Sequence, residues 1–376
     1  MRTKLRLRIS SNAMIGIMAA LLGLIAGAVL MALSGNNPFA GYAYLFKGGL
    51  MSVKRIGNSL AKATPLIFTG LSVAFAFNTG LFNIGASGQM LFGGFCATAI
   101  GLTLSLPKPL LLPVMLAAAM IGGGFWAFIP GLLKAKFNVH EVVSTIMMNW
   151  IGYWVIYYAV PAYFKAEYLE TESETISSGA SLRVGWLKEL FDGSVINLGI
   201  FLALIAVIVI SVILNKTVLG FELKAAGFNK HASEYAGMKV NRNIILSMVI
   251  SGILAGIGGM ALYTGYAVNI QIGVLPSEGF DGIAVALLGA NTPLGVLTSA
   301  IFFGLLHTGK GFMNANTEIP PQIGDTIIAT IIYFAATNAL IKRYMDKLKP
   351  KAAILGKKII KLLSKKGKDN SGEAKA

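Results

Sequence analysis

A cluster of amides and glycines at residues 77–90 is the part of the sequence whose chemistry best suits contact with a polar solute. The stretch FNTGLFNIGASGQM carries Asn78, Asn83 and Gln89 together with three glycines, and apolar runs flank it. Amide side chains both donate and accept hydrogen bonds. Irregular backbone at membrane depth is tolerated only where it is buried in protein or lines a water-filled cavity. The pattern therefore indicates either a broken helix that presents amides to a solute pathway or a tight turn between two spans.

A second polar stretch, residues 215–243, could dock a large water-soluble partner. It is the longest polar, helix-compatible insert between two apolar blocks, and it mixes small residues with charges of both signs. The segment from Gly304 to Lys310 matches G-x-x-x-x-G-K, but Gly311 follows where a nucleotide-binding loop has Ser or Thr. It also comes after an apolar span and not after a strand. We therefore reject an ATP site in this chain.

Residues for catalysis or metal binding are not found in a usable arrangement. The single cysteine, Cys96, lies in an apolar segment, and the three histidines are scattered along the chain. Neither a nucleophile with its base nor an H-E-x-x-H set is present. Glu278, Asp281 and Asp325 lie near predicted helix ends, whereas an ion-coupled transporter commonly carries a carboxylate well inside a span. We expect no enzyme activity, no metal and no cofactor, and an ion-coupled secondary transporter is the less favoured alternative.

Composition places these residues in a helical membrane protein. Of 376 residues, 55% are hydrophobic and 13% are charged, against roughly 25% charged residues in soluble domains. Apolar runs of about twenty residues, the length that crosses a bilayer, recur along the chain. The net charge of +16 is concentrated in loops and tails. That distribution fits the positive-inside rule and contact with anionic lipid, and it argues against nucleic acid as a partner.

The order of apolar and charged segments predicts an all-α, polytopic fold with about ten transmembrane helices, some broken, in two pseudo-repeated halves. Residues 1–340 are expected to form one transmembrane domain, and the basic residues 341–376 a cytoplasmic tail. The N-terminus is cytoplasmic, residues 36–63 lie outside the membrane or along its outer surface, loop 162–194 is external, and loop 215–243 is cytoplasmic. The predicted spans are 13–33, 64–77, the run ending at 104, 110–129, 142–160, 195–214, 244–264, two short spans within 276–306 joined by a sharp turn, and 326–340.

Four motifs in order resemble one family. They are LFNIGASGQM at 81–90, HEVVSTIMMNWI at 140–151, AAGFNKHASEYAGMKVNRNIILSMVISGILAGIGG at 225–259 and EGFDGIAVALLGANTPLG at 278–295. They resemble the permease subunits of bacterial ABC importers in the branched-chain amino acid and simple-sugar permease superfamily, and most closely the nucleoside-type branch. The resemblance covers residues 13–340.

This resemblance implies a function, a location and a set of partners. The chain would sit in the bacterial plasma membrane with both termini in the cytoplasm and move nucleosides by alternating access. A simple sugar such as ribose or galactose is the alternative solute. The implied partners are a cytoplasmic ABC ATPase subunit, a second homologous permease subunit, an extracellular substrate-binding lipoprotein and the lipid bilayer.

The resemblance also assigns roles to particular residues. Contact with the ATPase is implied for Lys224, Gly227, Asn229, Glu234, Tyr235, Ala236 and Gly237. The substrate pathway is implied near Phe77, Asn78, Phe82, Asn83, Gly85, Gly88 and Gln89, where amides would bond a nucleoside and aromatic rings would stack on it. This chain departs from the family at Lys224, where arginine is frequent, at Lys230–His231, which replaces a frequent proline-containing pair, and at Ser87, where glutamate is common. The last change removes a charge beside the pathway.

Overall fold

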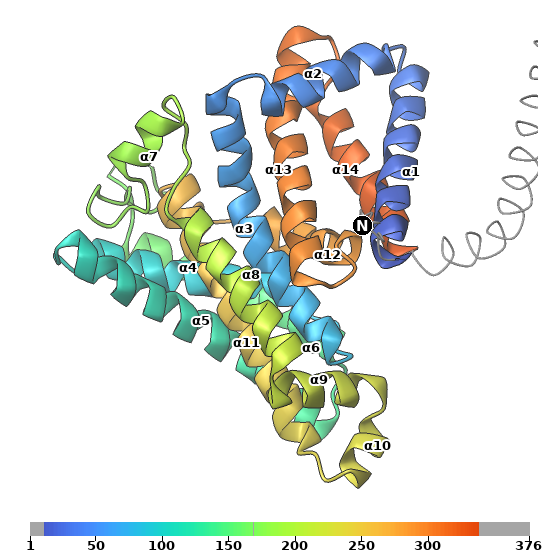
Figure 1. Ribbon diagram of the computed structural model, residues 1–376. Coiled ribbons are helices and arrows are strands. Elements are labelled where there is room, and N and C mark those ends of the chain that lie inside the picture. The colour runs from blue at the N-terminus through green and yellow to red at the C-terminus, as the bar shows by residue number, and fades with distance from the viewer. Residues whose placement is uncertain (1–10, 168, 338–376) are drawn as a thin grey trace, which may run out of the picture.

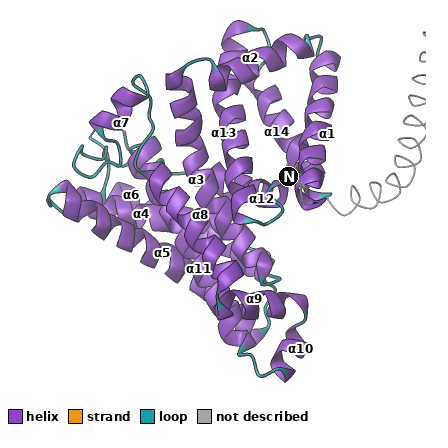
Figure 2. Ribbon diagram, viewed as in Figure 1, coloured by secondary structure: helices purple, strands orange, loops and turns teal. Residues whose placement is uncertain are grey.

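The computed structural model describes residues 11–167 and 169–337, which form helices and two isolated β-bridges without a β-strand in those ranges (Figure 1, Figure 2). The all-α class is therefore confirmed for the described residues. The predicted tail, 341–376, and the end of the last predicted span, 338–340, lie outside them. The helices are α1 (Ser11–Leu33), α2 (Pro38–Leu50), α3 (Val53–Asn78), α4 (Ala86–Thr103), α5 (Lys108–Phe137), α6 (Glu141–Tyr163), α7 (Gly185–Leu190), α8 (Gly199–Lys216), α9 (Val218–Phe228), α10 (Lys230–Tyr235), α11 (Val240–Met260), the π-helix η1 (Ala261–Tyr266), α12 (Ser277–Leu288), α13 (Pro293–Asn316) and α14 (Pro321–Ala336).

Six of the described helices are long and apolar enough to cross a bilayer. They are α1 from Gly16, α3, α5, α8, α11 together with η1, and α13. The other described helices are shorter or more polar. The structure therefore shows a multi-pass architecture, and the predicted count of about ten spans goes beyond what helix length and composition establish.

The second span starts earlier than the sequence indicated. Residues 36–63 were expected outside the membrane or along its outer surface, but α3 begins at Val53, capped by Ser52, whose hydroxyl accepts a hydrogen bond from Arg55 N at 3.3 Å. Arg55, one of the charges that suggested a loop, makes contacts with other elements of the fold. Arg55 donates to Gly48 O at 3.0 Å and lies 4.1 Å from the centre of the Phe312 ring. The helix thus begins before the predicted span, 64–77, and the position of residues 36–63 relative to the membrane stays a prediction.

The predicted interruption within residues 276–306 is present as the turn between α12 and α13. Ala290 and Asn291 adopt positive φ angles of 52° and 54°, which end α12, and Thr292 caps α13 by accepting from Gly295 N at 3.2 Å. With 12 residues, α12 is about 18 Å long, well short of the ~30 Å hydrocarbon core. It is therefore too short to cross the hydrocarbon core alone as a straight helix.

The most extensive helix contact in the described chain joins α5 and α11. Glycines from both helices form the seam, because a Cβ on Gly256 would overlap Ala119 O and a Cβ on Gly123 would overlap Gly252 O. Such small residues let two backbones approach closely where lipid provides no hydrophobic drive. Together with α3 and α4, this pair forms the centre of the fold and fixes the break between α3 and α4.

Candidate functional site

The residues predicted to line the pathway meet in the break between α3 and α4, but their amides bond to one another. Asn83 Nδ2 donates to Gln89 Oε1 at 2.9 Å and to Ser251 Oγ at 2.7 Å. Asn83 Oδ1 accepts from Gly85 N at 2.9 Å and from Gln89 Nε2 at 3.2 Å. The exposed fractions of Asn83 and Gln89 are 0% and 1%. In this conformation Asn83 has no hydrogen-bonding capacity left for a solute, so its contact with solute stays a prediction.

Neighbouring side chains hold the same break from several sides. Asn149 on α6 accepts from Gly88 N at 2.8 Å and donates to Ile84 O at 3.0 Å. The rings of Phe77 and Phe82 pack edge to face with centroids 5.0 Å apart. The buried break is thus a fixed, hydrogen-bonded unit, as the tight-turn interpretation expects.

This break touches the start of α12. Ser87 Oγ donates to Pro276 O at 2.8 Å, and a Cβ on Gly279 would lie only 2.5 Å from Ser87 N. Asn78 also donates to Asn291 O at 3.2 Å, in the turn that ends α12. Both interruptions of regular helix, far apart in sequence, therefore meet in the middle of the molecule.

The residues predicted to contact the ATPase lie on α9 and α10, which project from one end of the fold (Figure 1). Asn229 joins the two helices and caps α10 by accepting from Ala232 N at 3.0 Å. After Ala236 ends α10, Gly237 turns the chain with a φ of 80°. Phe228 and Tyr235 are 91% and 94% exposed. Highly exposed aromatic side chains beside a well-capped helix are typical of a surface that binds another protein.

Gly227, on α9, connects this surface to the α3–α4 break. A Cβ at Gly227 would lie 2.8 Å from Asn78 O and from Thr79 C, and 2.9 Å from Gly80 N. All three atoms belong to the backbone, so no flexible side chain could yield. The two sets of residues that the sequence singled out are therefore in direct backbone contact. Two more residues of the predicted ATPase-contact set have polar partners. Lys224 donates to Asn215 Oδ1 at 3.0 Å, and Glu234 lies 3.7 Å from His231 Nδ1.

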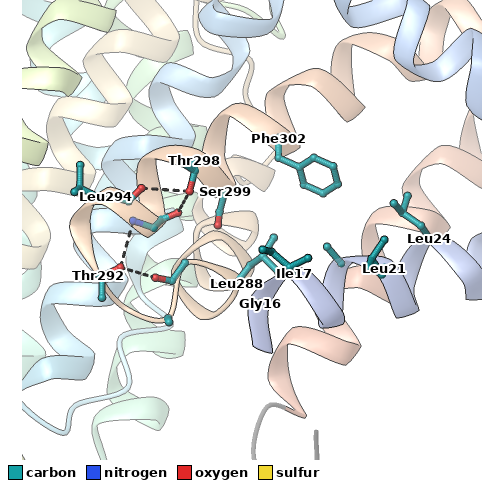
Figure 3. Close-up of a pocket in the computed structure, with 14 residues that line it drawn as sticks. Gly16, Ile17, Leu21, Leu24, Leu288, Thr292, Leu294, Thr298, Ser299 and Phe302 are labelled. Carbon is teal, nitrogen blue, oxygen red and sulfur yellow. Dashed lines mark hydrogen bonds between the residues drawn. The ribbon is translucent and has the colours of Figure 1, made fainter. Parts of the chain in front are cut away.

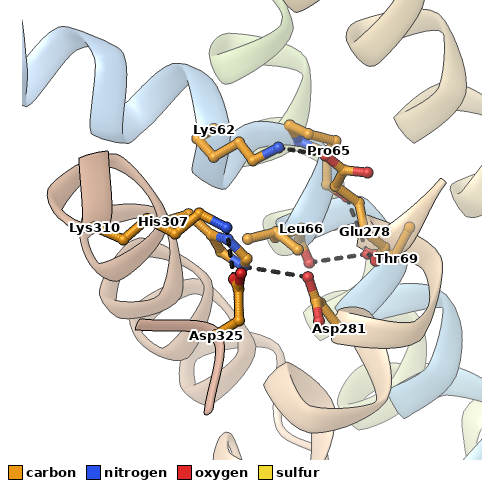
Figure 4. A network of polar contacts seen from close by, with 9 residues as sticks. All are labelled: Lys62, Pro65, Leu66, Thr69, Glu278, Asp281, His307, Lys310 and Asp325. Carbon is orange, nitrogen blue, oxygen red and sulfur yellow. Dashed lines mark hydrogen bonds and ion pairs between the residues drawn. The ribbon is translucent and has the colours of Figure 1, made fainter. Parts of the chain in front are cut away.

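Three acid–base pairs gather between α3, α12, α13 and α14, and the sequence did not indicate them as a cluster (Figure 4). Lys62 Nζ lies 2.5 Å from Glu278 Oε1, and Thr69 Oγ1 donates to the Glu278 carbonyl at 2.8 Å. The other two pairs are His307 with Asp281 at 3.2 Å and Lys310 with Asp325 at 2.5 Å. Each acid had been noted near a helix end, but pairing it with a base needed tertiary structure. No local sequence signal identifies these partners.

A cavity of about 710 Å³ lies between α1 and the α12–α13 turn (Figure 3). Its walls are mainly apolar, with Ile17 and Leu21 on α1 facing Phe302 on α13. The hydroxyl of Thr298 already donates to Gly295 O at 2.9 Å, and that of Thr292 to Gly289 O at 2.9 Å. This groove therefore offers little hydrogen bonding to a polar solute and resembles a surface that faces hydrocarbon.

Comparison with known proteins assigns this chain to a protein family. The profile of the family described as "Branched-chain amino acid transport system / permease component" matches residues 55–336. The chain belongs to this family. The expected resemblance is thus confirmed, and the chain is a membrane-embedded transport component and not an enzyme.

Three curated relatives refine the comparison. The chain is 42% identical to the guanosine ABC transporter permease protein NupP of Bacillus subtilis, over 91% of this chain and 98% of that protein. It is 40% identical to the nucleoside ABC transporter permease protein NupB of Lactococcus lactis, over 89% and 94%. The glucose ABC transporter permease protein TsgB13 of Haloferax volcanii is 31% identical, over 87% and 88%.

Proposed function

We propose that this chain is the membrane permease subunit of an ATP-driven ABC importer that carries nucleosides. The observation that carries this proposal is the near full-length similarity to two permeases named for guanosine and nucleoside transport, at 42% and 40% identity. Similarity to the glucose permease is weaker, at 31%. A sugar is therefore the second candidate for the solute.

In this proposal a cytoplasmic ATPase subunit docks on α9 and α10. The exposed Phe228 and Tyr235 are the contact residues, and closure of the ATPase dimer on binding ATP pushes on this helix pair. Gly227 transmits the displacement to the backbone of residues 78–80, with which it is in contact. The α3–α4 break and the start of α12 then move together, because Ser87 bonds to Pro276 O at 2.8 Å.

The signature residues have a revised role in this mechanism. Asn83, Gln89 and Ser251 form a buried hydrogen-bonded unit, so we assign them to holding the break in one of its two states. Opening toward the other side would exchange these bonds, and only then could the amides of Asn83 and Gln89 meet the solute. The predicted contact between these amides and the solute would therefore form in only one step of the transport cycle.

The proposed topology has about ten membrane-crossing or half-crossing segments. They are α1, α3, α4, α5, α6, α8, α11 with η1, the half-span α12, α13 and α14, with α7 outside and α9–α10 inside. Both termini are then cytoplasmic, and the basic tail 341–376 follows the permease domain 1–340 on that side. A second homologous permease completes the pathway, and an extracellular lipoprotein delivers the solute.

Uptake by reconstituted subunits tests the function. Proteoliposomes with the permeases, ATPase and solute-binding lipoprotein should take up labelled guanosine only when ATP reaches the ATPase. Competition with excess glucose, ribose or galactose should leave the rate unchanged. Uptake of a sugar but not of guanosine would transfer the assignment to sugars. Guanosine uptake by the permeases alone under an ion gradient, indifferent to ATP, would refute an ABC importer.

A further inference from the structure

We propose that a polar pocket beside the charge cluster is the entry site for the nucleoside, an inference that rests on the proposed function and gives its solute a place to bind. The pocket encloses about 550 Å³ between α3, the segment before α8, the end of η1 and α13, with Asn58, Tyr266, His307 and Thr308 in its walls. Small-molecule sites commonly measure about 300–1,000 Å³. In the proposed topology the pocket opens outward, because it lies toward the start of α3 and the end of α13.

Unused hydrogen-bonding groups distinguish this pocket from the α3–α4 break. Asn58 Oδ1 accepts from Val195 N at 3.1 Å, and its amide N–H groups have no protein partner among the described residues. The Thr308 hydroxyl likewise has none within residues 11–167 and 169–337. His307 Nε2 lies 3.2 Å from Asp281 Oδ2, yet the contact is too poorly directed for a hydrogen bond. These groups can bind ribose hydroxyls or the polar edge of a base.

The charges around the pocket favour a neutral solute. Each lysine of the cluster faces an acid, with Lys62 on Glu278 and Lys310 on Asp325 (Figure 4). A phosphate group would have to compete with Asp325 for Lys310, the lysine in the pocket wall, because that carboxylate already lies 2.5 Å from the ammonium group. The pocket therefore suits a nucleoside and disfavours a nucleotide.

Lys62 Nζ lies over one face of the Tyr266 ring, 5.0 Å from its centre, which leaves the other face as the surface on which a base could stack. Tyr266 ends the π-helix η1, and Val268 just beyond it has a φ of 67°, a rare conformation for a β-branched residue. Arg183 fixes this segment by donating to Gly265 O at 2.7 Å and to Tyr266 O at 2.5 Å. Observed backbone strain of this kind concentrates at binding sites, where the surrounding structure holds it in place.

The single cysteine of the chain permits a direct test. In a Cys96→Ser background, Thr308→Cys places a thiol in the pocket, and Ser178→Cys places a control thiol on the exposed external loop. A membrane-impermeant maleimide, added outside vesicles that hold all subunits, should label both thiols. Guanosine should slow labelling at position 308 at least tenfold and leave position 178 unaffected, whereas guanosine monophosphate and glucose should protect neither.

Kinetics of uptake provide the second readout. Thr308→Val and Asn58→Leu should raise the KM for guanosine about tenfold with the maximal rate retained, while Thr326→Val, outside the pocket, should leave both unchanged. If guanosine uptake proceeds but position 308 is unlabelled or unprotected and the KM values do not move, the entry site is refuted and the importer stands. If the Cys96→Ser assembly takes up no guanosine although ATP drives uptake of a sugar, both the nucleoside function and the entry site are refuted.

Discussion

Replacing Gly227 with alanine tests whether ATPase docking is mechanically connected to the α3–α4 break. The added Cβ would stand 2.8 Å from Asn78 O and Thr79 C. To restore a normal contact, α9 must withdraw by roughly half an ångström or more. Overpacking of this kind costs about 1–3 kcal/mol. In the proposed cycle this contact belongs to one of the two transport states, so the cost changes their balance by about 5–150-fold. We expect uptake to fall by a factor in that range.

The assay must separate lost coupling from lost folding. Gly227→Ala should insert and assemble with the ATPase at normal levels, since Phe228 and Tyr235 are unchanged. ATP hydrolysis should continue, while uptake per ATP hydrolysed falls. Gly185→Ala is the matched control, because nothing lies within 4 Å of a Cβ at Gly185. A Gly227→Ala transporter with an unchanged ratio of uptake to hydrolysis would refute the connection through residues 78–80.

Three further substitutions test the contacts described above. Lys62→Ala leaves buried Glu278 unpaired, so it should destabilise the permease by about 3–5 kcal/mol. Thermal unfolding in detergent measures this change, and adding Glu278→Gln should recover most of the lost stability. Tyr235→Ala should weaken ATPase binding by about 2 kcal/mol, or roughly thirtyfold, in a titration with the purified ATPase, whereas Tyr333→Ala should not change it. Asn149→Leu removes the bonds to Gly88 N and Ile84 O and should lower the free energy of unfolding by about 1–3 kcal/mol, and an unchanged melting temperature would show that Asn149 does not hold the break.

The sequence predicted the helical class and the two interruptions of regular helix, at residues 79–85 and 289–292, because these depend on local patterns. Glycine and amide clusters interrupt apolar runs, and the turn at residues 289–292 follows from Gly-Ala-Asn-Thr-Pro chemistry. The start of α3 was not predicted, because it depends on contacts with other helices. Lys47, Lys54 and Arg55 suggested solvent, but Arg55 donates to Gly48 O and lies 4.1 Å from the centre of the Phe312 ring, which is far away in sequence.

The candidate site also depends on contacts between segments that are distant in the sequence. An unpaired amide and a saturated one look alike in sequence, so Asn83 and Asn58 could not be ranked before their neighbours were known. Ser251 and Gln89 use the bonding groups of Asn83, whereas Asn58 keeps its amide N–H groups free among the described residues. The acids at Glu278 and Asp281 were visible from the start. Their bases come from helices that only the fold brings next to them.

The glycine seam between α5 and α11 has a consequence for how the protein is made. The ribosome delivers α5 to the membrane long before α11, so the glycine stripe on α5 can pack against α4 but stays uncovered on the side where α11 will dock. A seam with no side chains also has no rotamers to adjust, so a wrong helix that lodges there cannot be accommodated by repacking. Docking of α11 is therefore a late, all-or-none step, with α12, α13 and α14 still to follow. Methyl groups added at Gly123 or Gly256 would arrest the nascent permease at that stage and expose it to membrane proteases.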